Sequence, residues 1–243
     1  MQDLADYLKQ QARALAPERS RLLRRAQVGV RKRVLDLGCG AGSVTAELAE
    51  RCAGRVIALD RNLELLGLVD GAVPRVAADA LRLPWPADSF DLVFCQMLLL
   101  WVRDLSSLFA EARRILEPGG VLVIAAEPDY GGAIEFPDGA ALAPLWVAGL
   151  ERAGADPRVA RRLPALGRAA GFEVEARFHP GPPAPAQLAS VLDFEVQHLR
   201  QLPLNESERV ELEHRAAARR AAGANLFAWV PTLGMLCHAS SRS

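Results

Sequence analysis

The chain has 243 residues, of which 51% are hydrophobic and 24% are charged, and its 29 basic residues balance its 29 acidic ones. These proportions exclude a disordered, collagen-like or disulfide-rich chain, and the length is ample for a buried core. The neutral balance argues against a nucleic-acid partner, because a surface that follows phosphates normally carries a basic excess.

The four cysteines form no CxxC pair and have no histidine at metal-ligand spacing, so the sequence predicts neither a metal site nor a disulfide framework. The first residues lack the apolar run of a signal peptide, and no run of 18 apolar residues occurs that could span a bilayer. We therefore expect a cytoplasmic protein with reduced thiols and no membrane span.

Residues 3–30 carry leucines at helical spacing, interrupted at Pro17, which predicts one or two helices at the start of the chain. From Arg33 onward, short apolar runs alternate with helical stretches. The runs that predict buried strands are 34–37, 56–59, 76–78, 90–95 and 121–126. Nearly continuous apolar strands separated by helices predict a parallel sheet that is covered on both faces.

Three helices are predicted between those strands. Ser43 is placed to cap the first, Asn62 to cap a short second one, and the third is expected over 105–116. The segment 118–120, Pro-Gly-Gly, should end the third helix before the fifth strand. Right-handed crossovers make this a doubly wound α/β fold, whose ligand crevice lies beyond the carboxyl ends of the strands.

Beyond residue 140 the pattern is looser. The predicted elements are helices near 141–153 and 157–170, a strand at 172–178, a proline-rich turn at 180–185, and helices near 186–202 and 206–222. The apolar tail that follows predicts a final strand or hairpin.

The segment VLDLGCGAG places Gly38, Gly40 and Gly42 directly after the first strand and before a helix. Glycines there permit a positive φ in a tight turn and remove Cβ atoms that would hold a ligand away from the backbone. The dinucleotide fingerprint expects a third glycine at position 43, which is a serine. An NAD(P)-dependent oxidoreductase is therefore disfavoured.

Four segments together carry a family resemblance: VLDLGCGAG, VIALD, DALRLPWPADSFDLVFCQMLLLWV and RRILEPGGVLVIAAEP. In this order they resemble the class I S-adenosylmethionine-dependent methyltransferases, and among them the small-molecule group that contains the ubiquinone and menaquinone C-methyltransferases. The resemblance implies a Rossmann-like methyltransferase fold, S-adenosylmethionine as cofactor and a small-molecule acceptor. A quinone acceptor is less well supported, because Glu117 stands where that group has a basic residue.

The resemblance also implies the domain plan and the first half of the cofactor site. One domain over 1–243 would comprise a helical cap (1–32), a cofactor-binding core (33–134) and a substrate-side half (135–243) with a helical insertion at about 186–224. Asp36 would reach the methionyl ammonium of the cofactor. The turn of Gly38, Cys39 and Gly40 would lie beside its amino acid portion.

The second half of the implied cofactor site follows the next two strands. Asp60 would accept from the ribose hydroxyls, at close to the usual separation from the glycines, with Arg61 beside it. Asp79 and Ala80 would contact the adenine. Asp36 alone is better explained by a cap of the glycine turn, and Asp60 alone by a cap of the next helix, but their joint occurrence after successive strands favours a cofactor site.

The fourth and fifth strands complete the predicted site. Cys95 and Gln96 would offer a backbone carbonyl to the ammonium. Asp129 and Tyr130 follow the fifth strand, and His198 lies on a later helical stretch; these three are the candidate catalytic residues. A surface turn is the alternative for the first two, and a structural histidine is the more common explanation of the third.

Three questions stay open in the sequence. The same residues would occur in a non-catalytic interaction module that keeps the S-adenosylmethionine fold. The acceptor atom and the oligomeric state have no sequence signal.

Overall fold

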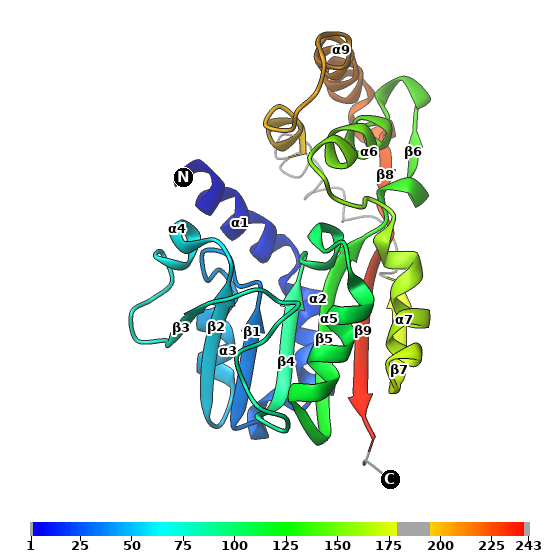
Figure 1. Cartoon of the computed structure of the whole chain (residues 1–243). Helices are drawn as coiled ribbons and strands as arrows, with labels where there is room; N and C mark the ends of the chain where they lie inside the picture. Colours follow the sequence, from blue (N-terminus) through cyan, green and yellow to red (C-terminus); the bar gives the residue numbers. More distant parts are fainter. Residues whose placement is uncertain (1, 179–194, 241–243) are drawn as a thin grey trace. The chain divides into compact units, whose positions relative to one another are not determined.

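Figure 1 shows a computed structural model of the chain, in which residues 2–178 and 195–240 are described. The chain divides into two compact units. Unit 1 comprises Met1–Glu127, Arg162–Arg177 and Leu233–Ser243, and unit 2 comprises Pro128–Arg161 and Phe178–Thr232. The units are taken in turn below, and the single domain expected over 1–243 stays a prediction.

Unit 1 is built on a seven-stranded sheet in the order β3-β2-β1-β4-β5-β9-β7. The strands are β1 (Arg33–Leu37), β2 (Arg55–Asp60), β3 (Arg75–Ala77), β4 (Phe90–Gln96), β5 (Leu116–Pro128), β7 (Phe172–Phe178) and β9 (Thr232–Ala239). Strands β1 to β5 pair in parallel, whereas β9 runs opposite to β5 (Figure 1). The predicted doubly wound, mostly parallel α/β fold is confirmed.

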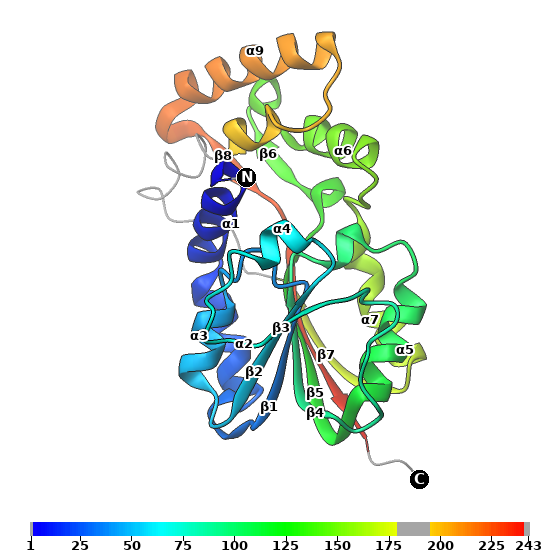
Figure 2. The same ribbon diagram turned by 60° about the vertical axis from the view of Figure 1, so that its left-hand side comes forward.

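Helices cover both faces of this sheet, with α2 and α3 on one face and α5 and α7 on the other (Figure 2). The helices of unit 1 are α1 (Gln2–Ala14), α2 (Ala16–Arg25), η1 (Val28–Val30), α3 (Thr45–Arg51), α4 (Leu63–Leu66), η2 (Leu99–Trp101), α5 (Leu105–Ile115) and α7 (Leu163–Ala169). The predicted interruption at Pro17 is confirmed, since Pro17 lies in the first turn of α2.

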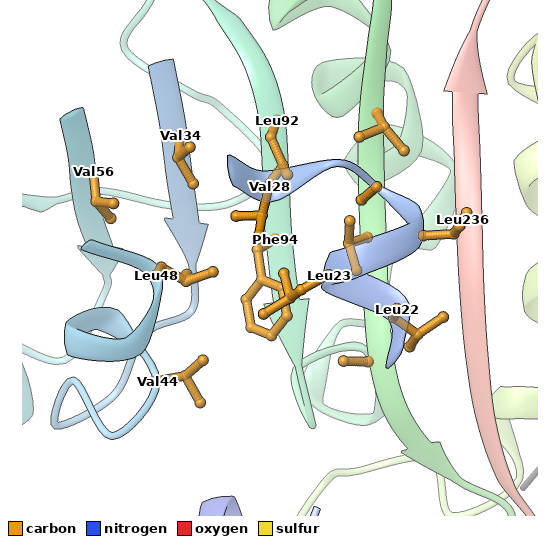
Figure 3. Close-up of a cluster of buried hydrophobic side chains, with 14 of the residues drawn as sticks. Leu22, Leu23, Val28, Val34, Val44, Leu48, Val56, Leu92, Phe94 and Leu236 are labelled. Atoms are coloured by element: carbon orange, nitrogen blue, oxygen red, sulfur yellow. The ribbon is translucent and has the colours of Figure 1, made fainter. Parts of the chain in front are cut away.

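The core beneath α2 and α3 joins these helices to the middle of the sheet. Figure 3 shows Leu23 of α2 and Val28 beside Phe94 of β4, with Leu48 of α3 nearby. Leu92 and Phe94 share this face because alternate side chains of a strand point the same way. Their neighbour Val93 is also fully buried. Burial on both faces explains why the strands read as continuous apolar runs.

Two predicted helix boundaries are wrong. Helix α3 begins at Thr45 with Val44 at its N-cap, and the Ser43 hydroxyl is buried without a hydrogen-bond partner among the described residues. Helix α5 ends at Ile115 and β5 begins at once at Leu116. Pro118–Gly120 therefore forms an irregularity within β5, where the pairing with β4 shifts register, instead of a stop before the strand. The predicted Asn62 cap of α4 is confirmed, since Asn62 accepts two amide hydrogens.

Unit 2 contains short elements. These are η3 (Tyr130–Gly132), β6 (Ile134–Phe136), η4 (Asp138–Ala140), α6 (Ala143–Arg152), η5 (Val159–Arg162), α9 (Glu206–Ala222), η6 (Gly223–Asn225) and β8 (Phe227–Trp229). Of the final strand or hairpin predicted in the tail, the strand is confirmed, because β9 joins the main sheet while β8 pairs with β6. The predicted turn at 180–185 and most of the helix at 186–202 lie outside the described residues.

A buried arginine connects the elements of unit 2. Arg219 of α9 is 2% exposed and donates to the carboxylates of Glu195 (2.6 Å) and Glu135. Glu135 also accepts the amide hydrogens of Leu142 and Ala143 at the start of α6 (2.9 and 2.8 Å). The Arg219 guanidinium and the Glu135 carboxylate therefore connect β6, α6 and α9. Burial raises the pKa of Glu195 above its ordinary range.

The role of the α2–α3 core can be tested with two leucines on neighbouring helices. Leu48 of α3 is fully buried, whereas Leu63 of α4 is 70% exposed. Leu48→Ala should lower the free energy of unfolding by about 2–5 kcal/mol, because it leaves a cavity. Leu63→Ala should change it by less than about 0.5 kcal/mol. Urea denaturation measures both, and equal effects would contradict the assignment of the core.

Candidate functional site

The turn between β1 and α3 holds three glycines at positive φ: +72° at Gly38, +53° at Gly40 and +76° at Gly42. Residues other than glycine seldom adopt this conformation, so the glycines make the tight turn possible. The amides of Gly38 and Cys39 both donate to the Leu59 carbonyl of β2 (2.8 and 3.0 Å). The glycine turn is therefore fastened to the carboxyl end of the neighbouring strand.

Two of these glycines also make room for side chains of the protein itself. A Cβ atom on Gly38 would lie 2.6 Å from Cδ1 of Leu98, which follows β4. A Cβ atom on Gly40 would lie 3.3 Å from Cδ1 of Leu8 in α1. Glycines are expected in this turn because they let a ligand approach the backbone closely. The structure adds a second reason, because the side chains of Leu98 and Leu8 also approach these glycines closely.

Asp60 links two parts of the predicted cofactor site directly. Its Oδ2 atom accepts the Gly40 amide hydrogen (2.8 Å), and its Oδ1 atom accepts that of Asn62 (2.8 Å). The side chain is half-buried, and Arg61 beside it is exposed. A carboxylate at the end of β2 therefore lies against the glycine turn, as a ribose-binding residue would require.

Asp79 and Ala80 lie just past the end of β3, in the neighbouring position of the sheet. Parallel pairing places Ala77 opposite Asp60, so Asp79 follows the same edge two residues later. The Asp79 carboxylate accepts the Leu81 amide hydrogen (2.9 Å) and is exposed, while Ala80 is half-buried. The carboxyl ends of β1, β2 and β3 thus each present an aspartate.

Asp36, at the end of β1, is 3% exposed and accepts a hydrogen bond from the Thr45 hydroxyl (2.6 Å). Burial raises the pKa of Asp36 to about 7, the Thr45 hydrogen bond opposes that rise, and the negative charge of Asp60 adds to it. The two aspartates are therefore within electrostatic range of each other. Burial therefore favours the protonated form of Asp36, and a neighbouring positive charge favours its ionised form.

Arg19 of α2 is a site residue that no sequence pattern indicated. The residue is 4% exposed, and its guanidinium donates to the Oε1 atom of Gln96 at the end of β4 (3.1 Å) and to Glu47 of α3 (2.8 Å). Its positive charge also favours the ionised form of Asp36. Because Arg19 only donates, the Gln96 amide must turn its oxygen toward Arg19.

The two predicted site cysteines differ in environment. Cys39 lies in the glycine turn and packs against the cluster of Ala58, Leu66 and Val69, whereas Cys95 is fully buried within β4. Burial raises the pKa of both thiols well above the ordinary range, so neither is a ready nucleophile. Only the backbone of Cys95 fits the predicted contact. No group of His, Cys, Asp and Glu among the described residues is arranged to hold a metal ion.

Glu127, near the end of β5, is fully buried. Its Oε1 atom accepts the amide hydrogens of Leu98 (2.8 Å) and Leu99 (3.1 Å), and burial raises the pKa of the carboxyl to about 7. The raised pKa values of Glu127 and Asp36 mean that the folded chain binds more protons than the unfolded one between about pH 4 and pH 7. Their shared contribution to stability is present at low pH and is lost as the pH rises through 7.

The three candidate catalytic residues all belong to unit 2, whereas the predicted cofactor residues belong to unit 1. Both carboxylate oxygens of Asp129 accept hydrogen bonds from Arg161 (2.7 and 2.8 Å). Tyr130 and His198 each stack on Trp146, with ring centroids 4.8 and 5.1 Å apart. Burial lowers the pKa of His198 to about 4, so the imidazole is neutral at pH 7. The structure brings two of the three together through Trp146, which sequence reasoning missed.

Comparisons with known proteins agree with this geometry. A family model described as a methyltransferase domain matches residues 35–124. Trans-aconitate 2-methyltransferase from Azoarcus sp. (strain BH72) is 40% identical over 136 residues, which cover 53% of this chain and 51% of that protein. A malonyl-[acyl-carrier protein] O-methyltransferase from Methylovorus sp. (strain MP688) is 36% identical over 134 residues, covering 50% of this chain and 44% of that protein. The chain spans about half the length of these curated relatives.

The fold likeness extends further than the sequence likeness. The solved structure of an S-adenosylmethionine dependent methyltransferase from Mesorhizobium loti has a TM-score of 0.55 and 21% identity, covering 87% of this chain and 92% of that one. The matched residues include the glycine turn and the ends of β1 to β4. Residues 35–124 therefore match a methyltransferase domain, and the chain shares its fold with this solved methyltransferase.

Proposed function

We propose that this protein transfers a methyl group from S-adenosylmethionine to a small-molecule acceptor. The observation that carries the proposal is the hydrogen bond from the Gly40 amide to Asp60 Oδ2 (2.8 Å), which holds the glycine turn against the carboxylate at the end of β2. A bound nucleoside needs both the glycine turn and the carboxylate at the same edge of the sheet.

The residues present fit this cofactor. Asp60 and Arg61 would hold the ribose, and Asp79 and Ala80 the adenine. The methionyl portion would lie beside the remaining predicted residues, which are Asp36, Gly38, Cys39, Gly40, Cys95 and Gln96. The buried carboxyl of Asp36 suits a cationic ammonium, because a positive charge favours its ionised form.

The cofactor supplies a methyl group already activated by the positive charge on sulfur, so the protein has mainly to align the acceptor with it. A general base is needed only where the acceptor atom carries a proton that must leave. Tyr130, His198 and Asp129 remain the proposed residues on the acceptor side. Among them, His198 is neutral at pH 7 and can accept a proton, although its lowered pKa makes it a weak base.

The setting of the reaction is part of the same proposal. The neutral charge balance supports a small molecule over a nucleic acid as acceptor. The four cysteines are free thiols, in keeping with the reducing cytoplasm. None of the helices formed by residues 2–178 and 195–240 has the length and apolar character needed to cross a membrane.

Calorimetric titration of the whole chain with S-adenosylmethionine, S-adenosylhomocysteine and NADH separates the proposal from its alternatives. We expect heat from the first two ligands and none from NADH. Methyl-labelled S-adenosylmethionine, incubated with candidate acids, alcohols and amines, then tests transfer. Binding of neither adenosyl ligand would contradict the proposal, and binding without transfer to any acceptor would favour the interaction module.

Replacing Asp60 tests the ribose contact. Asp60→Ala should weaken binding of S-adenosylhomocysteine by about 1–3 kcal/mol, because hydrogen bonds to a charged group are lost. Asp70→Ala is the matched control, since Asp70 also accepts a backbone amide in a turn, that of Ala72 (3.0 Å). Calorimetry measures both affinities. Equal affinities of the Asp60 variant and the wild type would contradict the assignment.

The proton on Asp36 should govern the pH dependence of cofactor binding. The affinity for S-adenosylhomocysteine should rise with pH through about 7 as the Asp36 carboxyl ionises and attracts the ammonium. Thr45→Val removes the hydroxyl that favours the ionised form, so it should move this rise to higher pH. Thr232→Val is the control, because its hydroxyl donates to the Val230 carbonyl. Titrations at several pH values measure the shift, and coincident profiles would contradict the role of Asp36.

A further inference from the structure

The turn that follows β4 is held by a side chain from the neighbouring strand. The Oε1 atom of Glu127 accepts both the Leu98 amide hydrogen (2.8 Å) and the Leu99 amide hydrogen (3.1 Å). Glu127 is fully buried, and its Oε2 atom has no hydrogen-bond partner among the described residues. A buried carboxyl that serves two backbone amides is a strong anchor, since each bond is charge-assisted when the group is ionised.

The anchored turn has a conformation that it would not adopt freely. Met97 has a φ of +54°, in the left-handed region that side chains other than glycine seldom occupy. Such a conformation persists only where the surroundings enforce it. The bonds to Glu127 begin at the next residue, Leu98, so they enforce the turn at the point where it leaves the strand.

The turn after β4 also contacts the glycine turn that follows β1. The Leu98 side chain fills the space that a Cβ atom on Gly38 would need. Such a Cβ atom would lie 2.6 Å from Cδ1 of Leu98. On the strand side, Gln96 receives the hydrogen bond from the buried Arg19. The positions of Gln96, Met97 and Leu98 are therefore fixed on both sides, by Arg19 and by Glu127.

We propose that Glu127 is a positioning residue of the methyl-donor site, which acts by holding the turn of Gln96–Leu98 against the glycine turn of Gly38. This inference rests on the proposed function. Glu127 acts through the turn and not by contact, because its side chain is fully buried. It adds the end of β5 to the cofactor site, which the sequence assigned to the ends of the first four strands.

A second buried carboxylate provides an internal comparison. Asp91 is 8% exposed and accepts the amide hydrogens of Lys32 (2.7 Å) and Arg33 (3.0 Å). It performs the same task at the start of β4, the opposite end of the strand from Gln96. Loss of Asp91 should destabilise unit 1 in the same way as loss of Glu127, but away from the cofactor site.

The experiment compares Glu127→Leu, Glu127→Gln and Asp91→Leu in the full chain, by calorimetric titration with S-adenosylhomocysteine and by thermal unfolding. Glu127→Leu should lower the affinity at least about tenfold, since both amides lose their acceptor. Glu127→Gln keeps an acceptor oxygen and should restore the affinity to within about threefold of the wild type. Asp91→Leu should lower the unfolding temperature and leave the affinity unchanged.

The outcomes separate the two proposals. A wild type that does not bind S-adenosylhomocysteine contradicts the proposed function itself. A wild type that binds, together with a Glu127→Leu variant of equal affinity, overturns the positioning role alone. Equal losses of affinity in Asp91→Leu and Glu127→Leu would also overturn it, because they would reveal only general destabilisation.

The glutamine variant keeps the inference testable if Glu127→Leu does not fold. Burial raises the pKa of Glu127 to about 7, so the wild type should gain affinity relative to Glu127→Gln as the pH rises through that value. The groups that share this environment are Asp36 of β1, Cys95 of β4 and Cys237 of β9, and all three are present in both proteins. A ratio independent of pH would overturn the role of the carboxylate.

Discussion

Parallel pairing is the constraint on which the site depends. Strands β3, β2, β1, β4 and β5 run in the same direction, so the turns that leave them meet at one edge of the sheet. Residues as far apart in the chain as Asp36, Asp60 and Glu127 thereby come to the same edge. The backbone amides of Gly40 and Leu98 are then bonded by carboxylates from the next strand.

Gathering acids at one edge has an electrostatic cost, which the structure meets in two ways. Asp36 and Glu127 are buried and hold their protons more tightly than in water, so part of the negative charge is absent near neutral pH. Arg19 supplies a buried positive charge from α2 and pairs with Glu47. The N-terminal helices are therefore part of the site's charge balance as well as a cover for the sheet.

The sequence predicted β1, β2, β4 and β5 well, because strands that are largely buried consist of nearly continuous apolar residues. The Asn62 cap was also predicted, because it depends only on residues that are near one another in the chain. Ser43 failed as a cap because the glycine turn extends to Val44, so α3 starts later than the hydroxyl could serve. Arg19 could not be predicted at all, since its partner Gln96 is 77 residues away and no periodic pattern joins them. The stack of Tyr130, Trp146 and His198 could not be predicted for the same reason, because its residues are distant from one another in the chain.

The path of the chain has a consequence for how this protein can be divided. The chain passes between the two units four times, after Glu127, Arg161, Arg177 and Thr232. The last two strands of the main sheet, β7 and β9, therefore come from beyond the first segment of unit 2. A fragment cut at residue 127 would keep the predicted cofactor residues but lack one edge of its sheet, with β5 left unpaired on that side. Exchanging unit 2 between relatives would accordingly require grafting two internal segments, 128–161 and 178–232, instead of fusing one half to another.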